Sequence, residues 1–292
     1  MSKALMSNEE FKTTKLEKET TFFPSRFNFL KMQNGLRPGF MHILLGETGK
    51  GKSTLLRAMA LDCCVDPFAK VLIWLTEEEE KDYKFELNHQ AMNKGLLERL
   101  EVCSELTMAS VPKDIKGYVA RIEQTLVELN CNALFFDNFT TSKTIQCADP
   151  RAEGVLAMEL RELASRAGIS LVILTHTRKG SQKVLSKLGA DDVRGNATIV
   201  NTAQFVYALQ PLSDSSGRTD FLHVEKARGY PSHAKTYILT YDLDLKTYMK
   251  DSRALSEEFW KKALSVNDLH RGKNGNITAP VRVKSTYSWD RD

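Results

Sequence analysis

The segment that most restricts the fold of this 292-residue chain is an apolar run, residues 41–45, followed directly by a glycine-rich loop, residues 46–53. The loop sequence GETGKGKS fits the pattern G-x-x-x-x-G-K-[ST] at every fixed position. Glycines in this pattern let successive backbone N–H groups point at one phosphate chain, and the following helix adds the positive end of its dipole. Residues 54–61 have the apolar pattern of such a helix. The sequence therefore predicts a nucleoside triphosphate site.

Individual residues of this loop have predicted roles. Lys52 is expected to reach the β- and γ-phosphates, and the hydroxyl of Ser53 is expected to bind Mg²⁺. The residues expected to contact the nucleotide are Gly46, Glu47, Thr48, Gly49, Lys50, Gly51, Lys52, Ser53 and Thr54.

Apolar runs alternate with helix-like segments along most of the chain, which is typical of an α/β fold. We expect a mostly parallel central sheet with helices on both faces. The segments with helical periodicity between strands are 115–129 and 156–167. After residue 209 the helical patterns stop and strands follow at hairpin-like intervals, so an antiparallel extension is expected at the C-terminal side. The predicted strands are 41–45, 71–76, 133–137, 171–175, 204–209, 221–226 and 235–241.

Composition limits the domain organisation and excludes several classes of protein. One ATPase domain is expected over 21–255. An N-terminal arm over 1–20 precedes it, and a short helix and polar tail over 256–292 follow it. The sequence has no apolar run of membrane-spanning length and a mixed-charge start, so a cytoplasmic location without membrane partners is expected. Five cysteines without paired spacing argue against a disulfide framework or a zinc site. A net charge of +4 does not by itself identify a nucleic-acid partner.

Carboxylates follow two of the predicted strands. Asp137 ends the run 133–137, as a residue that holds Mg²⁺ at the carboxyl edge of the sheet would, although an aspartate that caps a turn gives the same pattern. The run 71–76 ends at four glutamates, and one of them is well placed to polarise the water that attacks the γ-phosphate. We assign this role to Glu77, with Glu78 as the second candidate. The alternative is a solvated first turn of the next helix.

Basic and imidazole side chains mark two further strand ends. His176 follows the run 171–175, where a neutral histidine can hydrogen-bond the γ-phosphate, although a structural histidine is the simpler interpretation. Lys226 and Arg228 lie two residues apart at the end of an extended run. Side chains at that spacing share one face of a strand, so both could reach the same anion. A solvated strand end would have the same sequence.

Together these residues resemble the RecA-like motor domain of hexameric replicative helicases of the DnaB type. The resemblance covers about residues 22–250 and rests on Leu36-Arg37-Pro38-Gly39, the phosphate loop, Glu77, Asp137, His176 and the Lys226-x-Arg228 pair. It implies ATP and Mg²⁺ as cofactors and a homo-hexamer with ATP hydrolysed between subunits. Lys52, Ser53, Glu77 and Asp137 would act from one subunit. Lys226 and Arg228 would be supplied by its neighbour as a piston and an arginine finger.

The resemblance also implies single-stranded DNA in a central channel, held by the loops after Asp137 and after His176. The second loop is polar and basic, which suits contacts to a phosphate backbone, although a solvated loop would look similar. The predicted DNA-binding residues are Arg178, Lys179, Lys183, Lys187 and Arg194. DnaB-type proteins carry a separate N-terminal domain, whereas this chain has only a short arm before Thr21. Its size is closer to stand-alone RepA-type helicases of plasmids and phages, whose His-Thr motif also resembles His176-Thr177.

The leading hypothesis is therefore a ring-forming, ATP-driven DNA helicase or translocase of replication, from a phage or mobile element, with replisome proteins as further partners. A RecA-like recombinase or mediator that forms filaments on single strands is a second hypothesis. A KaiC-like regulatory ATPase that binds no nucleic acid is the third. The Lys226-x-Arg228 pair favours the helicase, and the basic loop argues against the regulatory ATPase.

Overall fold

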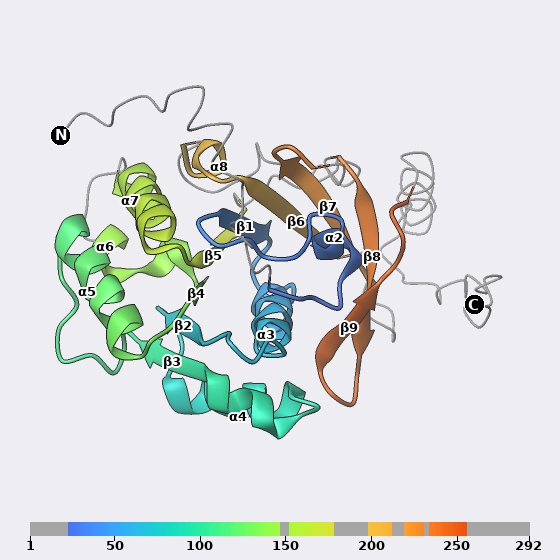
Figure 1. Cartoon of the computed structure of the whole chain (residues 1–292), viewed down its shortest axis with the longest axis horizontal. Coiled ribbons are helices and arrows are strands. Elements are labelled where there is room, and N and C mark those ends of the chain that lie inside the picture. Colours follow the sequence, from blue (N-terminus) through green and yellow to red (C-terminus); the bar gives the residue numbers. More distant parts are fainter. Residues whose placement is uncertain (1–22, 147–151, 178–197, 212–218, 231–233, 256–292) are drawn as a thin grey trace, which may run out of the picture.

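The computed structural model describes residues 23–146, 152–177, 198–211, 219–230 and 234–255. These residues form one nine-stranded sheet in the order β3-β2-β4-β5-β1-β6-β7-β8-β9 (Figure 1). The strands are β1 (Met41–Gly46), β2 (Val71–Leu75), β3 (Leu100–Ser104), β4 (Ala133–Asp137), β5 (Ser170–His176), β6 (Phe205–Pro211), β7 (Thr219–Ala227), β8 (Thr236–Asp242) and β9 (Thr247–Asp251). The helices are α2 (Asn28–Lys31), α3 (Lys52–Cys63), α4 (Glu80–Gln90), η1 (Lys94–Arg99), α5 (Ile115–Glu128), η2 (Phe139–Thr141), α6 (Lys143–Gln146), α7 (Ala152–Ala167) and α8 (Thr198–Thr202).

The sheet changes character between β6 and β7. Strands β3, β2, β4, β5, β1 and β6 are parallel to their neighbours, and β7, β8 and β9 pair antiparallel. In Figure 1 the antiparallel strands lie on the side of the sheet away from α5. The predicted fold class, a mostly parallel sheet with an antiparallel C-terminal extension, is confirmed.

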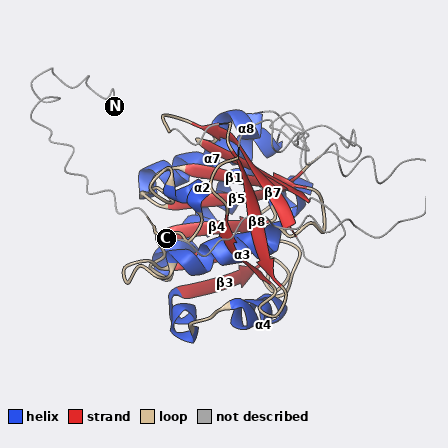
Figure 2. Ribbon diagram, turned by 90° about the vertical axis from the view of Figure 1, so that its right-hand side faces the viewer, coloured by secondary structure: helices blue, strands red, loops and turns tan. Residues whose placement is uncertain are grey.

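Alternation along the strands sorts the side chains into two cores, one on each face of the sheet. Leu44 of β1 joins the core formed with α2, α3 and α4. Ile43 and Leu45 join the core formed with α5, α7 and α8. Because side chains two apart along a strand share a face, strands covered by helices on both faces are apolar throughout. Figure 2 shows the helices gathered around the sheet.

The structure contains two strands, β3 and β9, that the sequence analysis does not predict. Both lie at the ends of the strand order, where each has only one neighbouring strand. Their sequences, LEVCS and TYMKD, contain charged residues and are only partly buried. Edge strands with exposed positions do not produce the continuous apolar run from which the central strands were recognised.

Several predictions fall outside the described residues: the arm over 1–20, the basic residues Arg178, Lys179, Lys183, Lys187 and Arg194, and the segment 256–292. Within the described part of the chain, no helix is both long and apolar enough to cross a bilayer. Cys63, Cys64 and Cys131 are buried free thiols in this same part.

Candidate nucleotide-binding site

Four neighbouring strands bring the predicted nucleotide-site residues to one edge of the sheet. Gly46 ends β1 and is paired with His176 at the end of β5. Asp137 ends β4 and is paired with Leu75 of β2, two residues before Glu77. The order β2-β4-β5-β1 is uninterrupted and all four strands are parallel, so their carboxyl ends lie together. Ligands of open α/β sheets bind at this edge.

The phosphate loop needs glycine for two different reasons. Gly49 and Gly51 have φ values of 71° and 88°, a region that side chains with a Cβ rarely adopt. Gly46 is restricted by space, because a Cβ there would lie 2.7 Å from the carbonyl oxygen of Leu209 on β6. The loop therefore closes tightly over the start of α3, where the backbone N–H groups of the first helical turn lack helical partners and suit an anion.

Lys52 in the first turn of α3 is almost fully buried, with 4% of its surface exposed. Its Nζ donates a hydrogen bond to the carbonyl oxygen of Glu47 at 2.5 Å. Burial lowers the pKa of Lys52 to about 8, while the nearby carboxylates of Asp137 and Glu77 act in the opposite direction. The ammonium group therefore stays mainly protonated at neutral pH and is already partly desolvated.

Ser53 and Asp137 place a hydroxyl and a carboxylate group next to this loop. The Ser53 Oγ donates to Asp137 Oδ1 at 3.3 Å. Burial raises the pKa of Asp137 to about 6, and the hydrogen bond from Ser53 partly offsets that effect. Hydroxyl and carboxylate oxygens are the ligands that Mg²⁺ prefers, so these two residues fit a nucleotide-bound Mg²⁺.

His176 is hydrogen-bonded both to Thr48 of the phosphate loop and to Asn138, the residue after Asp137. Asn138 Oδ1 accepts from the backbone N–H and the hydroxyl of Thr140, at 3.0 and 2.8 Å, which turns the Asn138 amide nitrogen toward His176 Nε2. Because Nε2 then accepts, the proton of a neutral imidazole lies on Nδ1, 3.4 Å from the Thr48 hydroxyl. The histidine thus contacts both sides of the site.

Glu77 and Glu78 are both exposed at the end of β2. Glu77 is close enough to Lys52 to raise the pKa of the lysine, and Glu78 is close enough to Asp137 to raise the pKa of the aspartate. Each glutamate therefore interacts electrostatically with a residue of the site, Glu77 with Lys52 and Glu78 with Asp137.

A comparison with family models agrees with this geometry, because residues 8–182 match a family described as AAA domain. The chain belongs to this family. It is a family of P-loop ATPases that includes helicase-type and RecA-like domains. The resemblance to RecA-like helicase domains is therefore confirmed as membership of this broader ATPase family. No curated protein matches the chain.

Lys226 and Arg228, which follow the matched residues in the chain, lie far from the phosphate loop of their own subunit. Lys226 pairs with Val206, which pairs with Ile43, three residues before Gly46. The N–H of Arg228 donates to Gln204, whose N–H donates to Met41 at the start of β1. At about 3.3 Å per residue, Arg228 is displaced from Gly46 by roughly 17 Å along the strand direction, beyond the length of its side chain.

The same two cations meet at the end of α8. Lys226 Nζ donates to the carbonyl oxygens of Val200 and Asn201, at 2.8 and 3.0 Å. Arg228 Nη2 donates to the Asn201 oxygen at 3.3 Å. Both side chains therefore point to the same side, as their spacing in the sequence predicted. Burial lowers the pKa of Lys226, and the positive charges of Arg228 and Arg161 lower it further.

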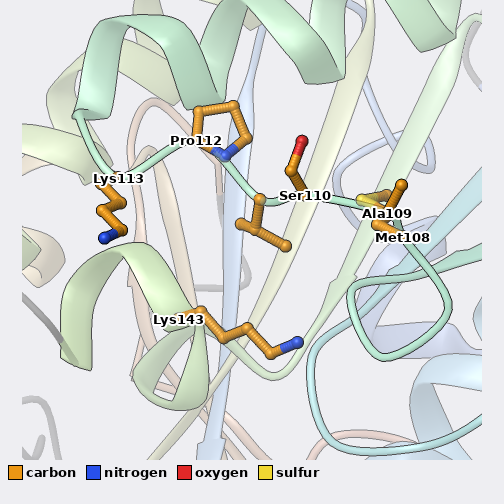
Figure 3. A pocket seen from close by; sticks show the side chains of 7 residues that line it. Met108, Ala109, Ser110, Pro112, Lys113 and Lys143 are labelled. Atoms are coloured by element: carbon orange, nitrogen blue, oxygen red, sulfur yellow. The ribbon is translucent and has the colours of Figure 1, made fainter.

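A separate pocket of about 300 Å³ lies beyond β3 and is shown in Figure 3. It is lined by Met108, Ala109, Ser110, Val111, Pro112, Lys113 and Lys143. The lining residues come from the loop between β3 and α5 and from the start of α6, and they include no residue of the phosphate loop.

The sequence did not indicate two residues that contact the AAA nucleotide site. Asn138 orients His176, and Tyr83 of α4 donates from its hydroxyl to Asp137 Oδ2 at 3.3 Å. In the sequence Tyr83 and Leu87 are spaced like core residues of an amphipathic helix, and both are buried. Only the folded chain brings the Tyr83 hydroxyl to the end of β4.

Proposed function

We propose that this AAA domain is the motor of a ring-forming, ATP-driven DNA helicase or translocase that acts in replication. The observation that carries the proposal is the separation of Lys226 and Arg228 from their own phosphate loop. Two cations on one face, out of reach of the subunit's own nucleotide, are suited to a nucleotide held by a neighbouring subunit.

In this proposal the residues divide the work between two subunits. Lys52 neutralises charge on the β- and γ-phosphates, and Ser53 and Asp137 hold Mg²⁺, which supplies further positive charge when bound. Glu77 polarises the attacking water and His176 senses the γ-phosphate. Lys226 and Arg228 of the neighbour stabilise the negative charge that develops on the transferred phosphoryl group.

This arrangement supports a head-to-tail assembly. One surface donates cations and a different surface accepts them, so each subunit can be followed by another in the same orientation. Such heterologous contacts close into a ring or continue as a helical filament, depending on the rotation between subunits. A hexameric ring corresponds to a helicase and an open filament to a recombinase.

A DNA partner is supported by the chain segment that follows His176. Residues 178–187 contain Arg178, Lys179, Lys183 and Lys187 and follow His176-Thr177 directly in the sequence. Contact between these cations and a phosphate backbone would link the nucleotide site to single-stranded DNA.

The main experiment measures ATP hydrolysis with and without single-stranded DNA, together with strand displacement on a forked duplex. Stimulation by DNA with ATP-dependent displacement is the expected result. Stimulation and filament formation without displacement would instead indicate the recombinase or mediator. Hydrolysis that DNA does not affect, with no DNA binding, would indicate the regulatory ATPase.

A salt titration tests the DNA contact directly. Changing Lys179, Lys183 and Lys187 to Gln should weaken single-stranded DNA binding and flatten the slope of log affinity against log salt by about 0.7 per lost contact. Lys94→Gln and Lys116→Gln remove exposed charges elsewhere and serve as controls. Equal affinity and slope in both sets would contradict a role for the basic segment.

A further inference from the structure

The two carboxylate oxygens of Asp137 have different partners. Oδ1 accepts from Ser53 Oγ, and Oδ2 accepts from the Tyr83 hydroxyl, each at 3.3 Å. Tyr83 has no exposed surface and lies on the side of α4 that packs into the core. One oxygen therefore faces the residue that fits Mg²⁺, and the other faces the protein interior.

Tyr83 is itself held in place by the neighbouring helix. The guanidinium carbon of Arg57 lies 4.9 Å from the centre of the Tyr83 ring. Arg57 belongs to α3, one turn after Ser53, and its Nε donates to Gln90 Oε1 of α4 at 3.2 Å. With 7% of its surface exposed, Arg57 has little freedom to move away. Helices α3 and α4 together fix the ring and, through its hydroxyl, the orientation of the Asp137 carboxylate.

We propose that Tyr83 is a positioning residue for the metal-bound nucleotide. By occupying Oδ2, its hydroxyl keeps Oδ1 of Asp137 directed at Ser53 and at the Mg²⁺ that these residues fit. Hydrogen bonds to metal-binding carboxylates commonly set ligand orientation and metal affinity in this way. The inference rests on the ATP site of the proposed function and is independent of its DNA part. A tyrosine with only a packing role would not affect the dependence of nucleotide binding on the metal.

The test compares Tyr83→Phe, which removes only the hydroxyl, with the wild type. Binding of a fluorescent ADP is measured across a Mg²⁺ titration and in EDTA, and Mn²⁺ binding to the nucleotide complex is followed by electron paramagnetic resonance. We expect the metal concentration for half-maximal binding to rise about 10-fold, with unchanged affinity in EDTA. Tyr118→Phe is the matched control, because it removes a buried hydroxyl that donates to Glu105, another buried carboxylate. This control should behave as the wild type.

Wild-type metal dependence in a folded Tyr83→Phe protein, or an equal change in Tyr118→Phe, would overturn the inference. A double-mutant cycle adds a second criterion: in an Asp137→Asn background, Tyr83→Phe should cause no further change in metal dependence. If Tyr83→Phe does not fold, Arg57→Lys loosens the ring while keeping the hydroxyl, and it should shift the metal dependence in the same direction. Absence of DNA stimulation alongside the expected metal shift would contradict only the DNA part of the proposed function.

Discussion

Single residues of the site combine burial with charge. Lys52 and Asp137 are both buried, at 4% and 8% exposure, and their pKa values move toward neutrality from opposite sides. Desolvation is the main cause in both cases, and it makes each group respond strongly to a charged ligand. A bound triphosphate would supply negative charge next to Lys52, and its metal ion would supply positive charge next to Asp137.

The assignment of Glu77 as the general base leads to a test by substitution. Glu77→Gln preserves size but removes the basic group, so nucleotide should still bind while hydrolysis falls by roughly 10²–10⁴. Glu78→Gln is the matched control one residue away. Steady-state ATP hydrolysis and nucleotide affinity separate the two effects. A larger loss of hydrolysis in Glu78→Gln would transfer the role to Glu78.

The burial of His42 on β1 leads to a prediction of how acid affects the free energy of unfolding. The His42 ring is fully buried and stacked on the Phe205 ring, with 4.5 Å between the ring centroids. Burial lowers the pKa of His42 to about 3. The unfolded chain, with an ordinary histidine pKa near 6.5, therefore takes up the proton first. The contribution of His42 to stability is fully present above about pH 6.5 and is lost as the pH falls toward 3, by up to about 1.4 kcal/mol per pH unit.

Urea unfolding between pH 7 and 5 measures this effect. His42→Gln removes the titrating group, so the difference in unfolding free energy between wild type and variant should shrink as the pH falls. His89→Gln, at an exposed histidine of α4, is the control. Parallel pH curves for wild type and His42→Gln would show that His42 does not cause the acid sensitivity.

At the level of elements, the contact between β1 and β6 sets the start of the phosphate loop. Gly46 is paired with Leu209, and no room exists for a Cβ between them. The antiparallel strand β7 then continues the sheet beyond β6. The loop geometry therefore depends on a strand that is distant from it in sequence.

Replacing Gly46 by Ala tests this dependence. The added methyl group would lie 2.7 Å from the Leu209 oxygen, so β1 and β6 must separate. We expect a loss of about 1–3 kcal/mol in unfolding free energy, typical of overpacking, together with weaker nucleotide binding. Gly95→Ala, where the nearest atom is a side-chain oxygen of Asn93 at 3.3 Å, is the control and should stay within about 0.5 kcal/mol of wild type. Equal stability of the two variants would contradict the close approach.

Across the whole molecule, one continuous sheet holds the phosphate loop and the Lys226–Arg228 pair at two separate places. The parallel strands place the phosphate loop and Asp137 at their carboxyl ends. The reversal at β7 returns the chain to the amino end of β1, where Lys226 and Arg228 lie. The proposed assembly requires this separation, because a subunit that supplied its own cations would not need a neighbour.

The prediction at this scale is complementation between two inactive variants. Arg228→Ala should leave nucleotide affinity nearly intact and reduce hydrolysis by on the order of 10³, since an arginine finger acts on charge developing in the transition state. Mixing it with Glu77→Gln should restore part of the activity, because some interfaces then pair an intact Glu77 with an intact Arg228. Arg121→Ala, at an exposed arginine of α5, is the control and should be fully active. No recovery despite subunit exchange would mean that Arg228 is only a solvated strand end, or that both residues serve the site of one subunit.

The sequence alone determined the features that depend on local pattern. The phosphate loop has fixed residues at fixed spacing, and the central strands are apolar throughout because helices cover both of their faces. The strand ends at Glu77, Asp137 and His176 could be predicted to meet because parallel strands share a carboxyl edge.

Only the tertiary structure decided the features that depend on long-range pairing. The edge strands β3 and β9 are as long as the recognised strands β2 and β4 but contain charged residues and lack a continuous apolar run. Their place in the sheet follows from which neighbour they hydrogen-bond. Strand order and register decided that Lys226 and Arg228 lie away from their own phosphate loop. Helix packing decided that the Tyr83 hydroxyl meets Asp137 across 54 residues of sequence. Such contacts depend on distances between elements, which a pattern along one chain does not encode.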